Sequence, residues 1–363
     1  MAVQLALTVV TRLAVPARST GILTNLTKGV GLSSFTSTIC SGLFGRSFST
    51  SSHLKNRKVT WEAKGDVAVV YVNDPHSEVN TWSAQTKKEM VEAMEGIWNN
   101  DSVGSAVVIS PKPHSFISGV DVDMISACKS KEEATLLSQQ WQGMMKRIEG
   151  SPKPIVAAIS GWCLDGGLEF ATACQYRLAT RSRTSLVSRE VRLGLMPSAG
   201  GTQRLTKLLG PYHALDVMLE GCRINADEAL KIGLVHKVVD TLDLKYFEDI
   251  AVDCARGIVD KTITLTPEKN WTKIAQDFYY CFPIFRYSVY WNMLERIMNR
   301  ETLTTAPLKI LETVQIGVEL GPEAGFRAES RNFGELVMSP ETNVLTAPYQ
   351  DLIIRYLKRK SRT

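Results

Sequence analysis

Residues 163–180 read CLDGGLEFATACQYRLAT, and this stretch decides the fold. Gly166 and Gly167 form a turn that is followed by Glu169 at the start of a helical stretch, and the closing QYRLAT is typical of a buried strand. Backbone N–H groups at a glycine turn can donate hydrogen bonds to negative charge that develops on a ligand. A second carboxylate, Asp165, stands directly before the glycine pair. The stretch therefore indicates a ligand site with an additional charge beside it.

Short β-branched strands alternate with helical stretches on both sides of this segment. Such alternation predicts an α/β fold in which neighbouring strands pair in parallel. The expected strands are 67–73, 105–111, 154–161 and 175–180, and the expected helix between the first two is 83–98. Beyond residue 243 the strands stop, and the apolar spacing predicts helices over 245–260, 271–299 and 306–320.

The first 61 residues differ in composition from the rest of the chain. They contain seven Lys and Arg residues and no acidic residue, which together with their Ser and Thr content is typical of a mitochondrial presequence. We therefore divide the chain into a disordered presequence at 1–55, an α/β core at 60–243, and a helical segment with a C-terminal tail at 244–363. After residue 61, 35 basic residues face 37 acidic ones, so charge does not favour a nucleic-acid partner.

Two further glycine turns follow expected strands, at 116–125 and 193–205. Glu190 lies just before the second of them, and it forms a candidate acid/base pair with Glu169 because one carboxylate can accept a proton while the other donates one. Each turn alone is better explained as a tight connection, and most glutamates are simply solvated, so only the combination of turns and carboxylates indicates a site. The cysteines and histidines show no spacing typical of metal ligands, so no metal site is expected.

Four ordered motifs carry a specific resemblance. They are FISGVDVDM, PIVAAISGWCLDGGLE, EVRLGLMPSAGGTQRL and NADEALKIGLVHKVV. In this order they resemble the signatures of the crotonase, or enoyl-CoA hydratase/isomerase, superfamily. KGDVAVVYVN, CQYRLAT, APLKILETV and FGELVMS are most similar to the hydratase domain of mitochondrial trifunctional enzyme α subunits. The resemblance implies a crotonase-type ββα spiral core with an appended C-terminal helical segment. No G-x-G-x-x-G follows a strand, so the dinucleotide-binding dehydrogenase half of those subunits is not expected here.

The resemblance also implies roles for individual residues. Family members bind an acyl-CoA thioester and hold the enolate oxygen with two backbone N–H groups, which correspond to Val120 and Gly166. Glu169 and Glu190 correspond to the glutamates that handle water and the α-carbon proton. Further substrate-binding positions implied by the motifs are Gly119, Asp121, Gly167, Pro197 and Gly200. No metal or redox cofactor is implied, since coenzyme A arrives with the substrate.

Several residues depart from the family pattern near this site. Asp165 replaces the first glycine of the family's Gly-Gly-Gly-x-Glu, Arg189 stands where proline is usual, Ser198 replaces a glycine, and Trp82 replaces a small or aliphatic residue. A carboxylate at 165 is expected to oppose enolate charge and to raise the pKa of neighbouring glutamates. A side-chain pair with Arg189 could offset that charge, and the sequence leaves this open.

Two functions remain open at this point. The first is an enoyl-CoA hydratase, a lyase of fatty acid β-oxidation, that acts on medium- or long-chain 2-enoyl-CoA in the mitochondrial matrix. The second is a weak or inactive acyl-CoA-binding or scaffold relative of the trifunctional enzyme α subunit. Residues 271–300 combine aromatic and basic side chains around Pro283. They indicate either a helix packed on its own core or, as the resemblance implies, contact with the inner membrane near a thiolase β subunit in an oligomer.

Overall fold

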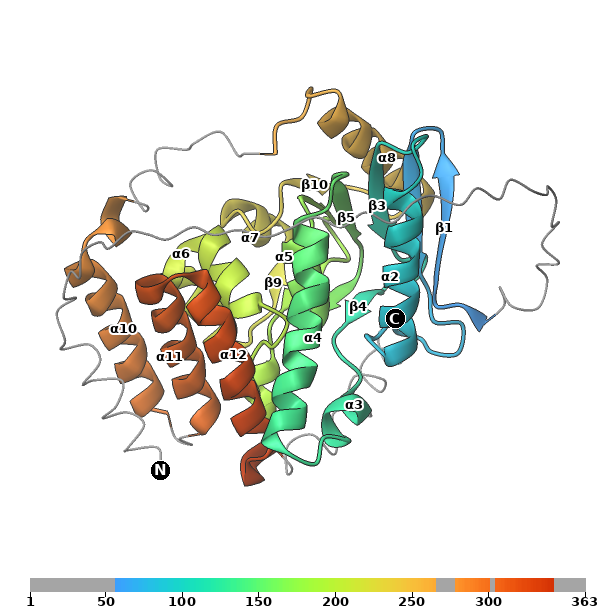
Figure 1. The fold of residues 1–363 in the computed structure, drawn as a ribbon. Helices are drawn as coiled ribbons and strands as arrows, with labels where there is room; N and C mark the ends of the chain where they lie inside the picture. The colour runs from blue at the N-terminus through green and yellow to red at the C-terminus, as the bar shows by residue number, and fades with distance from the viewer. Residues whose placement is uncertain (1–55, 266–277, 301–303, 343–363) are drawn as a thin grey trace, which may run out of the picture.

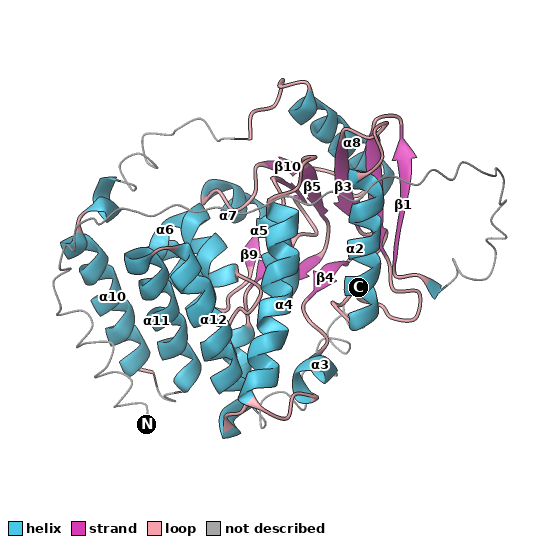
Figure 2. Ribbon diagram, in the orientation of Figure 1, coloured by secondary structure: helices cyan, strands magenta, loops and turns pink. Residues whose placement is uncertain are grey.

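A computed structural model describes residues 56–265, 278–300 and 304–342 of the chain (Figure 1). The predicted presequence and the C-terminal tail from residue 343 lie outside these residues. Two sheets, the helices that follow their strands and a group of C-terminal helices form the described part (Figure 2).

The larger sheet has the strand order β1-β2-β3-β5-β7-β10. β1 pairs with β2 in antiparallel fashion, and every later pair in this sheet is parallel. The strands are β1 (Val59–Lys64), β2 (Val67–Val72), β3 (Ser105–Ile109), β5 (Ile155–Ile159), β7 (Tyr176–Thr180) and β10 (Lys237–Val239). The four strands predicted from the sequence are thus confirmed as β2, β3, β5 and β7. β1 was not predicted, because only Val59 of its residues VTWEAK is buried and the strand has no continuous apolar run.

The smaller sheet has the order β4-β6-β8-β9, and it runs beside the glycine turns. Its strands are β4 (Ser115–Ser118), β6 (Trp162–Leu164), β8 (Ser185–Val187) and β9 (Ile224–Asn225). Between β3 and β8, successive strands alternate between the two sheets, so the chain advances by one strand in each sheet with every repeat. This alternation is the expected ββα spiral, and it brings the three glycine turns to one region.

Helices cover both faces of the larger sheet and extend the core at the C-terminal side. They are α2 (Ala84–Trp98), α3 (Val122–Ser126), α4 (Lys131–Glu149), α5 (Gly166–Ala173), η2 (Glu190–Leu193), α6 (Gly201–Glu220), α7 (Ala226–Lys231), α8 (Leu244–Val259), α10 (Pro283–Met298), α11 (Thr305–Leu320) and α12 (Pro322–Val337). Figure 1 shows α4, α12, α11 and α10 side by side. α12 packs against both α4 and α11, and α11 also packs against α6.

The apolar alternation along each strand explains why the sheet is buried on both sides. In β2, Val67 and Val69 face α8, whereas Ala68 and Val70 face the main core. Such two-sided burial is typical of parallel sheets and accounts for the continuous apolar runs in the sequence. α8 opens the segment that we assigned as helical at 244–363, and it packs directly on the core sheet.

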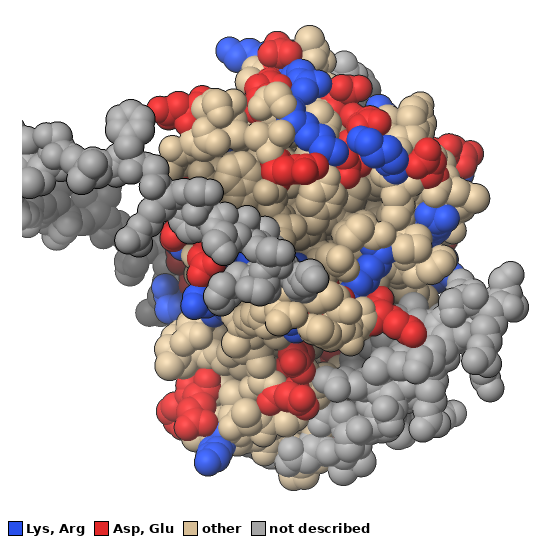
Figure 3. Space-filling model, turned by 90° about the vertical axis from the view of Figure 1, so that its right-hand side faces the viewer, with Lys and Arg blue, Asp and Glu red and all other residues tan. Residues whose placement is uncertain are grey.

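The surface of the described part carries charges of both signs. On the face shown in Figure 3, Lys and Arg side chains lie intermixed with Asp and Glu side chains. Within the described residues, no helix has both the length and the apolar character that crossing a membrane would require.

The contact between α5 and β4 depends on a residue without a side chain. A Cβ atom at Gly167 would lie 2.1 Å from the carbonyl oxygen of Ile117, a distance that real Cβ atoms do not reach. Gly167→Ala is therefore expected to lower the free energy of unfolding by about 2–4 kcal/mol, because backbone must shift in a buried region. Urea unfolding measures this.

The matched control is Gly143→Ala in the exposed middle of α4, where an added Cβ meets nothing within 4 Å. This variant should gain about 0.5–1 kcal/mol from alanine's helix propensity. Equal stability of the two variants would contradict the close packing of α5 on β4.

Candidate active site

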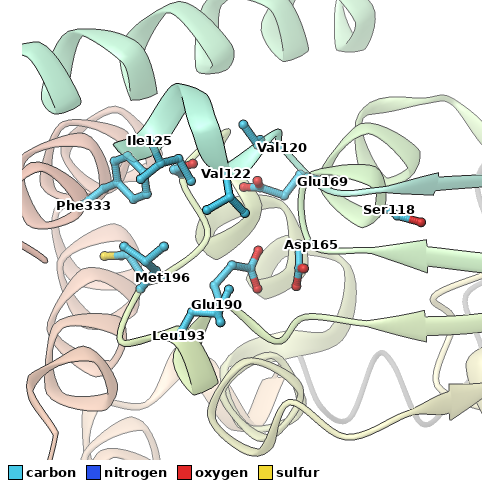
Figure 4. A pocket seen from close by; sticks show the side chains of 13 residues that line it. Ser118, Val120, Val122, Ile125, Asp165, Glu169, Glu190, Leu193, Met196 and Phe333 are labelled. Carbon is cyan, nitrogen blue, oxygen red and sulfur yellow. The ribbon is translucent and has the colours of Figure 1, made fainter. Parts of the chain in front are cut away.

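Three acidic side chains line one small cavity between α3, α5, η2 and α12. Asp165 and Glu190 direct their carboxylates toward one another, and Glu169 lies on the other side of the same space (Figure 4). The cavity has a volume of about 40 Å³, which is room for one water-sized molecule. Its apolar lining consists of Val120, Val122, Ile125, Leu193, Leu195, Met196 and Phe333. The structure thus brings together the two glutamates that the sequence paired.

Glu169 lies in the first turn of α5 and is held by the start of α6. Its Oε1 accepts hydrogen bonds from the backbone N–H groups of Ala199 and Gly201, both at 2.7 Å. Because Oε1 is fixed in this way, Oε2 is the oxygen that remains for proton transfer. Burial raises the pKa of Glu169 to about 8, and the negative charge of Glu329 adds to this rise, against the two backbone hydrogen bonds.

Glu190 opens η2, directly after β8, and is held from the opposite side. The hydroxyl of Ser188 donates a 2.7 Å hydrogen bond to its Oε2. Burial raises the pKa of Glu190 well above its usual range, and the charges of Asp165 and then Glu169 raise it further. Two carboxylates at one cavity whose pKa values are both raised by burial are suited to acid/base chemistry.

Two backbone N–H groups complete the cavity. Trp82 N–H donates to Gly119 O and Asp121 N–H donates to Trp82 O. Because successive N–H groups of an extended chain point to opposite sides, the N–H of Val120 points away from Trp82. Gly166 is the first residue of α5, so its N–H has no partner within the helix.

The two N–H groups belong to backbone segments in contact, since a Cβ at Gly166 would lie 3.6 Å from Val120 N. Neither group donates to another atom of the described residues. Both N–H groups are therefore available at the cavity, as the predicted role in binding an oxyanion requires.

The other predicted substrate-binding positions shape the backbone. Gly200 has a φ of +99°, and its N–H donates to Glu329. Gly119 has a φ of +93° and lies against Asp165, where an added Cβ would come within 3.2 Å of that side chain. Pro197 packs beside Gly201. Asp121 does not line the cavity, because its carboxylate caps α3 by accepting from Asp123 N–H.

Two residues of α12 were missed by the sequence interpretation. Phe333 closes the cavity, and Glu329 is fully buried and binds the start of α6. The buried residues of α12 include Gly325, Ala328, Glu329, Asn332, Phe333 and Leu336, which follow helical spacing. A carboxylate on the apolar stripe of an amphipathic helix is the signal that could have identified Glu329.

Comparison with known proteins agrees with this fold. The sequence profile of the Enoyl-CoA hydratase/isomerase family matches residues 62–268. The chain belongs to this family. The fatty acid oxidation complex subunit alpha of Idiomarina loihiensis is 38% identical over 292 residues, which confirms the predicted relation to α subunits of this type. That match covers 79% of this chain but only 40% of the relative's length.

Solved structures of the family are similar in fold. Pseudomonas aeruginosa DspI is 30% identical, with a TM-score of 0.52, over 60% of this chain and 85% of that one. An enoyl-CoA hydratase from Bacillus halodurans is 18% identical, with a TM-score of 0.56, over 80% of this chain and 98% of that one. The second likeness concerns the fold alone.

Trp82, a departure from the enoyl-CoA hydratase/isomerase pattern, contacts the backbone of Gly166. Its indole N–H donates a 3.1 Å hydrogen bond to Gly166 O, and its ring packs against Phe170 and Trp141. Ser198 lines the cavity, and its carbonyl oxygen accepts from the Ser138 hydroxyl. The large side chain at 82 thus fixes the backbone that carries the Gly166 donor.

Asp165 has the backbone conformation of the glycine it replaces. Its φ is 51° and its ψ is −119°, a region that is almost restricted to glycine and costs about 1–3 kcal/mol for other residues. Its Oδ1 accepts a 2.7 Å hydrogen bond from the backbone N–H of Arg189. In this hydrogen bond the donor is the backbone of Arg189 and not its guanidinium group. The expected rise in a neighbouring glutamate's pKa occurs at Glu190.

Replacing Asp165 separates its charge from its backbone strain. Asp165→Gly removes both, whereas Asp165→Asn removes the charge and keeps the side chain at positive φ. We expect both variants to raise the rate of 2-enoyl-CoA hydration at neutral pH about tenfold, since a charge beside the oxyanion opposes enolate formation. Only Asp165→Gly should also gain about 1 kcal/mol in unfolding free energy, because strain relief exceeds one lost hydrogen bond.

Steady-state kinetics and urea unfolding of the two variants measure these effects. If both proteins fold and bind acyl-CoA yet neither hydrates 2-enoyl-CoA faster than the wild type, the charge at 165 does not limit this site.

Proposed function

We propose that this chain is an enoyl-CoA hydratase, a lyase that adds water to a 2-enoyl-CoA thioester. The observation that carries the proposal is the arrangement of Glu169 and Glu190 on opposite sides of a cavity for one water, beside two free backbone donors. Family members that isomerise more often have one glutamate at these positions, so the pair favours hydration. Coenzyme A enters as part of the substrate, and no separate cofactor takes part.

The geometry supports a specific division of labour. Two backbone hydrogen bonds hold Oε1 of Glu169 and lower its pKa against the effect of burial, so Glu169 acts as the base through Oε2. It takes a proton from water as the hydroxyl bonds to the β carbon of the enoyl group. The electron pair of the double bond moves toward the thioester oxygen, where the N–H groups of Val120 and Gly166 bind it. Glu190 then gives its proton to the α carbon, and the thioester is restored.

Medium- or long-chain substrates and fatty acid β-oxidation are part of the same proposal. They are supported by the similarity to a fatty acid oxidation complex subunit alpha, of which this chain spans about 40%. We place the protein in the mitochondrial matrix on the composition of residues 1–55. An oligomer with a thiolase β subunit is proposed on the resemblance to trifunctional enzyme α subunits.

A second candidate is a weak or inactive acyl-CoA-binding subunit that keeps the family's assembly surfaces. The observation that favours it is Asp165, whose charge and strained backbone lie within the site. Both functions retain the acyl-CoA-binding fold, so binding does not distinguish them. They differ in whether the protein turns over a 2-enoyl-CoA. Loss of the 2-enoyl thioester absorbance on adding purified protein therefore separates them.

Glu169→Gln and Glu190→Gln test the assignment of the acid/base pair. Each is expected to lower kcat by about 10²- to 10⁴-fold, because each removes one proton-transfer step while the amide keeps the size of the side chain. The matched control, Glu92→Gln, changes an exposed glutamate on α2 and should leave the rate unchanged. Wild-type protein that binds acyl-CoA without measurable turnover would instead favour the binding subunit.

We also propose that α10 contacts the inner membrane. Exposed apolar side chains gather on and just before this helix, namely Phe278, Phe282, Ile284, Phe285 and Trp291. Residues 271–277 of the proposed segment lie outside the described part. Cosedimentation with anionic vesicles should be strong for the wild type and lost in the double variant Phe282→Asp and Phe285→Asp, because amphipathic binding depends on buried apolar area. Equal cosedimentation of both proteins would contradict the contact.

A further inference from the structure

Four consecutive backbone N–H groups at the start of α6 are shared between two buried carboxylates. Ala199 and Gly201 donate to Oε1 of Glu169, as described above. Gly200 donates to Oε1 of Glu329 at 2.6 Å, and Thr202 donates to its Oε2 at 3.0 Å. The N-cap residue Gly200 has no side chain to accept these bonds. Carboxylates from α5 and α12 therefore cap this helix in alternation.

Glu329 is bound by neutral donors only. The Thr202 hydroxyl and the Gln142 side-chain amide add hydrogen bonds at 2.5 and 2.9 Å, and the side chain has 0% exposure. No Lys or Arg forms an ion pair with it among the described residues. A buried carboxylate without a cationic partner is costly unless it is fully hydrogen-bonded, and its charge acts strongly on neighbours.

Few other charges face this pair of carboxylates. On α6, Arg204 lies near Glu169 and lowers its pKa, but Arg204 is itself paired with Glu149 of α4. On the cavity side, the facing groups are Glu190 and Asp165, which are both acidic. Further along α12, Glu335 is paired with Lys131 and Lys309 and is directed elsewhere. The negative charge of Glu329 is therefore not neutralised near Glu169.

We propose that Glu329 is a positioning residue for hydration that acts through Glu169. Glu329 accepts hydrogen bonds from Gly200 and Thr202, and so it holds the α6 N-terminus in the position from which Ala199 and Gly201 bind Glu169. In addition, the buried charge of Glu329 opposes a second charge on Glu169. The proposal rests on the hydratase function for its kinetic consequence. It goes beyond that function because α12, in the appended helical segment, then takes part in the chemistry of the core.

The electrostatic consequence has a definite sign. Burial and the charge of Glu329 raise the pKa of Glu169 from its ordinary 4.5 to about 8, and burial raises the pKa of Glu329 as well. Glu169 must lose its proton to act as a base. Removing the charge of Glu329 lowers the pKa of Glu169, so the base forms at lower pH.

Glu329→Gln tests this, because glutamine keeps one oxygen acceptor for α6 while it loses the charge. The acidic limb of the kcat/KM profile should move to lower pH by about one unit, with maximal kcat within a few-fold of the wild type. The matched control is Glu323→Gln, which makes the same change at an exposed position of α12 and should leave the limb in place. An unmoved limb in Glu329→Gln would overturn the proposal and leave Glu329 as a structural cap alone.

A second readout does not depend on turnover. Because the folded chain keeps a proton on Glu169 that the unfolded chain loses above about pH 4.5, the free energy of unfolding falls as pH rises from about 4.5 to about 8. Urea unfolding should show a smaller fall in Glu329→Gln, since one buried carboxylate and its repulsion are gone. If Glu329→Gln does not fold, Glu169→Gln provides the same test, because it removes the other member of the carboxylate pair and should also reduce the fall in unfolding free energy with pH.

The pH profile of kcat/KM and the pH dependence of the unfolding free energy together distinguish a failure of the proposed coupling from a failure of the proposed hydratase function. A reduced pH dependence of stability in a protein that never hydrates 2-enoyl-CoA would support the coupling and refute the hydratase function. A pH dependence of stability that stays unchanged in both variants would overturn the coupling whatever the activity.

Discussion

The buried N-terminus of α6 is the constraint on which the active site depends. Its first N–H groups have no partner within the helix, and they lie in the interior, where water cannot satisfy them. The chain supplies acceptors from α5 and α12 because Gly200 cannot cap the helix itself. Charged acceptors bind such a terminus better than neutral ones, since they also meet the positive end of the helix dipole. The same hydrogen bonds that complete the fold therefore place Glu169 at the cavity.

This arrangement requires small residues at the terminus. A Cβ at Gly201 would lie 2.7 Å from Oε1 of Glu169 and 2.9 Å from Pro197, so a side chain there would displace the carboxylate. Gly200 needs its positive φ to turn its N–H toward α12. Gly200 and Gly201 of the AGGTQRL motif are thus required because two carboxylates approach the same backbone closely. This requirement is more specific than a need for a flexible turn.

The sequence predicted those parts of the site that are carried by local motifs. Glu169, Glu190, Val120 and Gly166 each belong to a glycine turn at the end of a strand, and the parallel arrangement of strands brings such turns together. Glu329 and Phe333 could not be placed in this way, because α12 reaches the cavity only through tertiary packing against α4 and α11. The strands of the smaller sheet were recognised only as turns, since three or four residues carry too little periodicity.

Asp165 acts on the site in two opposite senses, and the structure shows why. As a charge beside the Gly166 donor, it disfavours the enolate, which is the effect that its sequence position indicates. As the charged group with the largest effect on Glu190, it keeps that residue protonated, and a protonated Glu190 is what the α carbon requires. The first effect raises the barrier to the enolate directly, whereas the second acts only through the protonation of Glu190. Burial raises the pKa of Glu190 in the same direction as Asp165 does, whereas burial does nothing to offset the charge of Asp165 beside the Gly166 donor, so the cost to the enolate is the effect that is specific to Asp165.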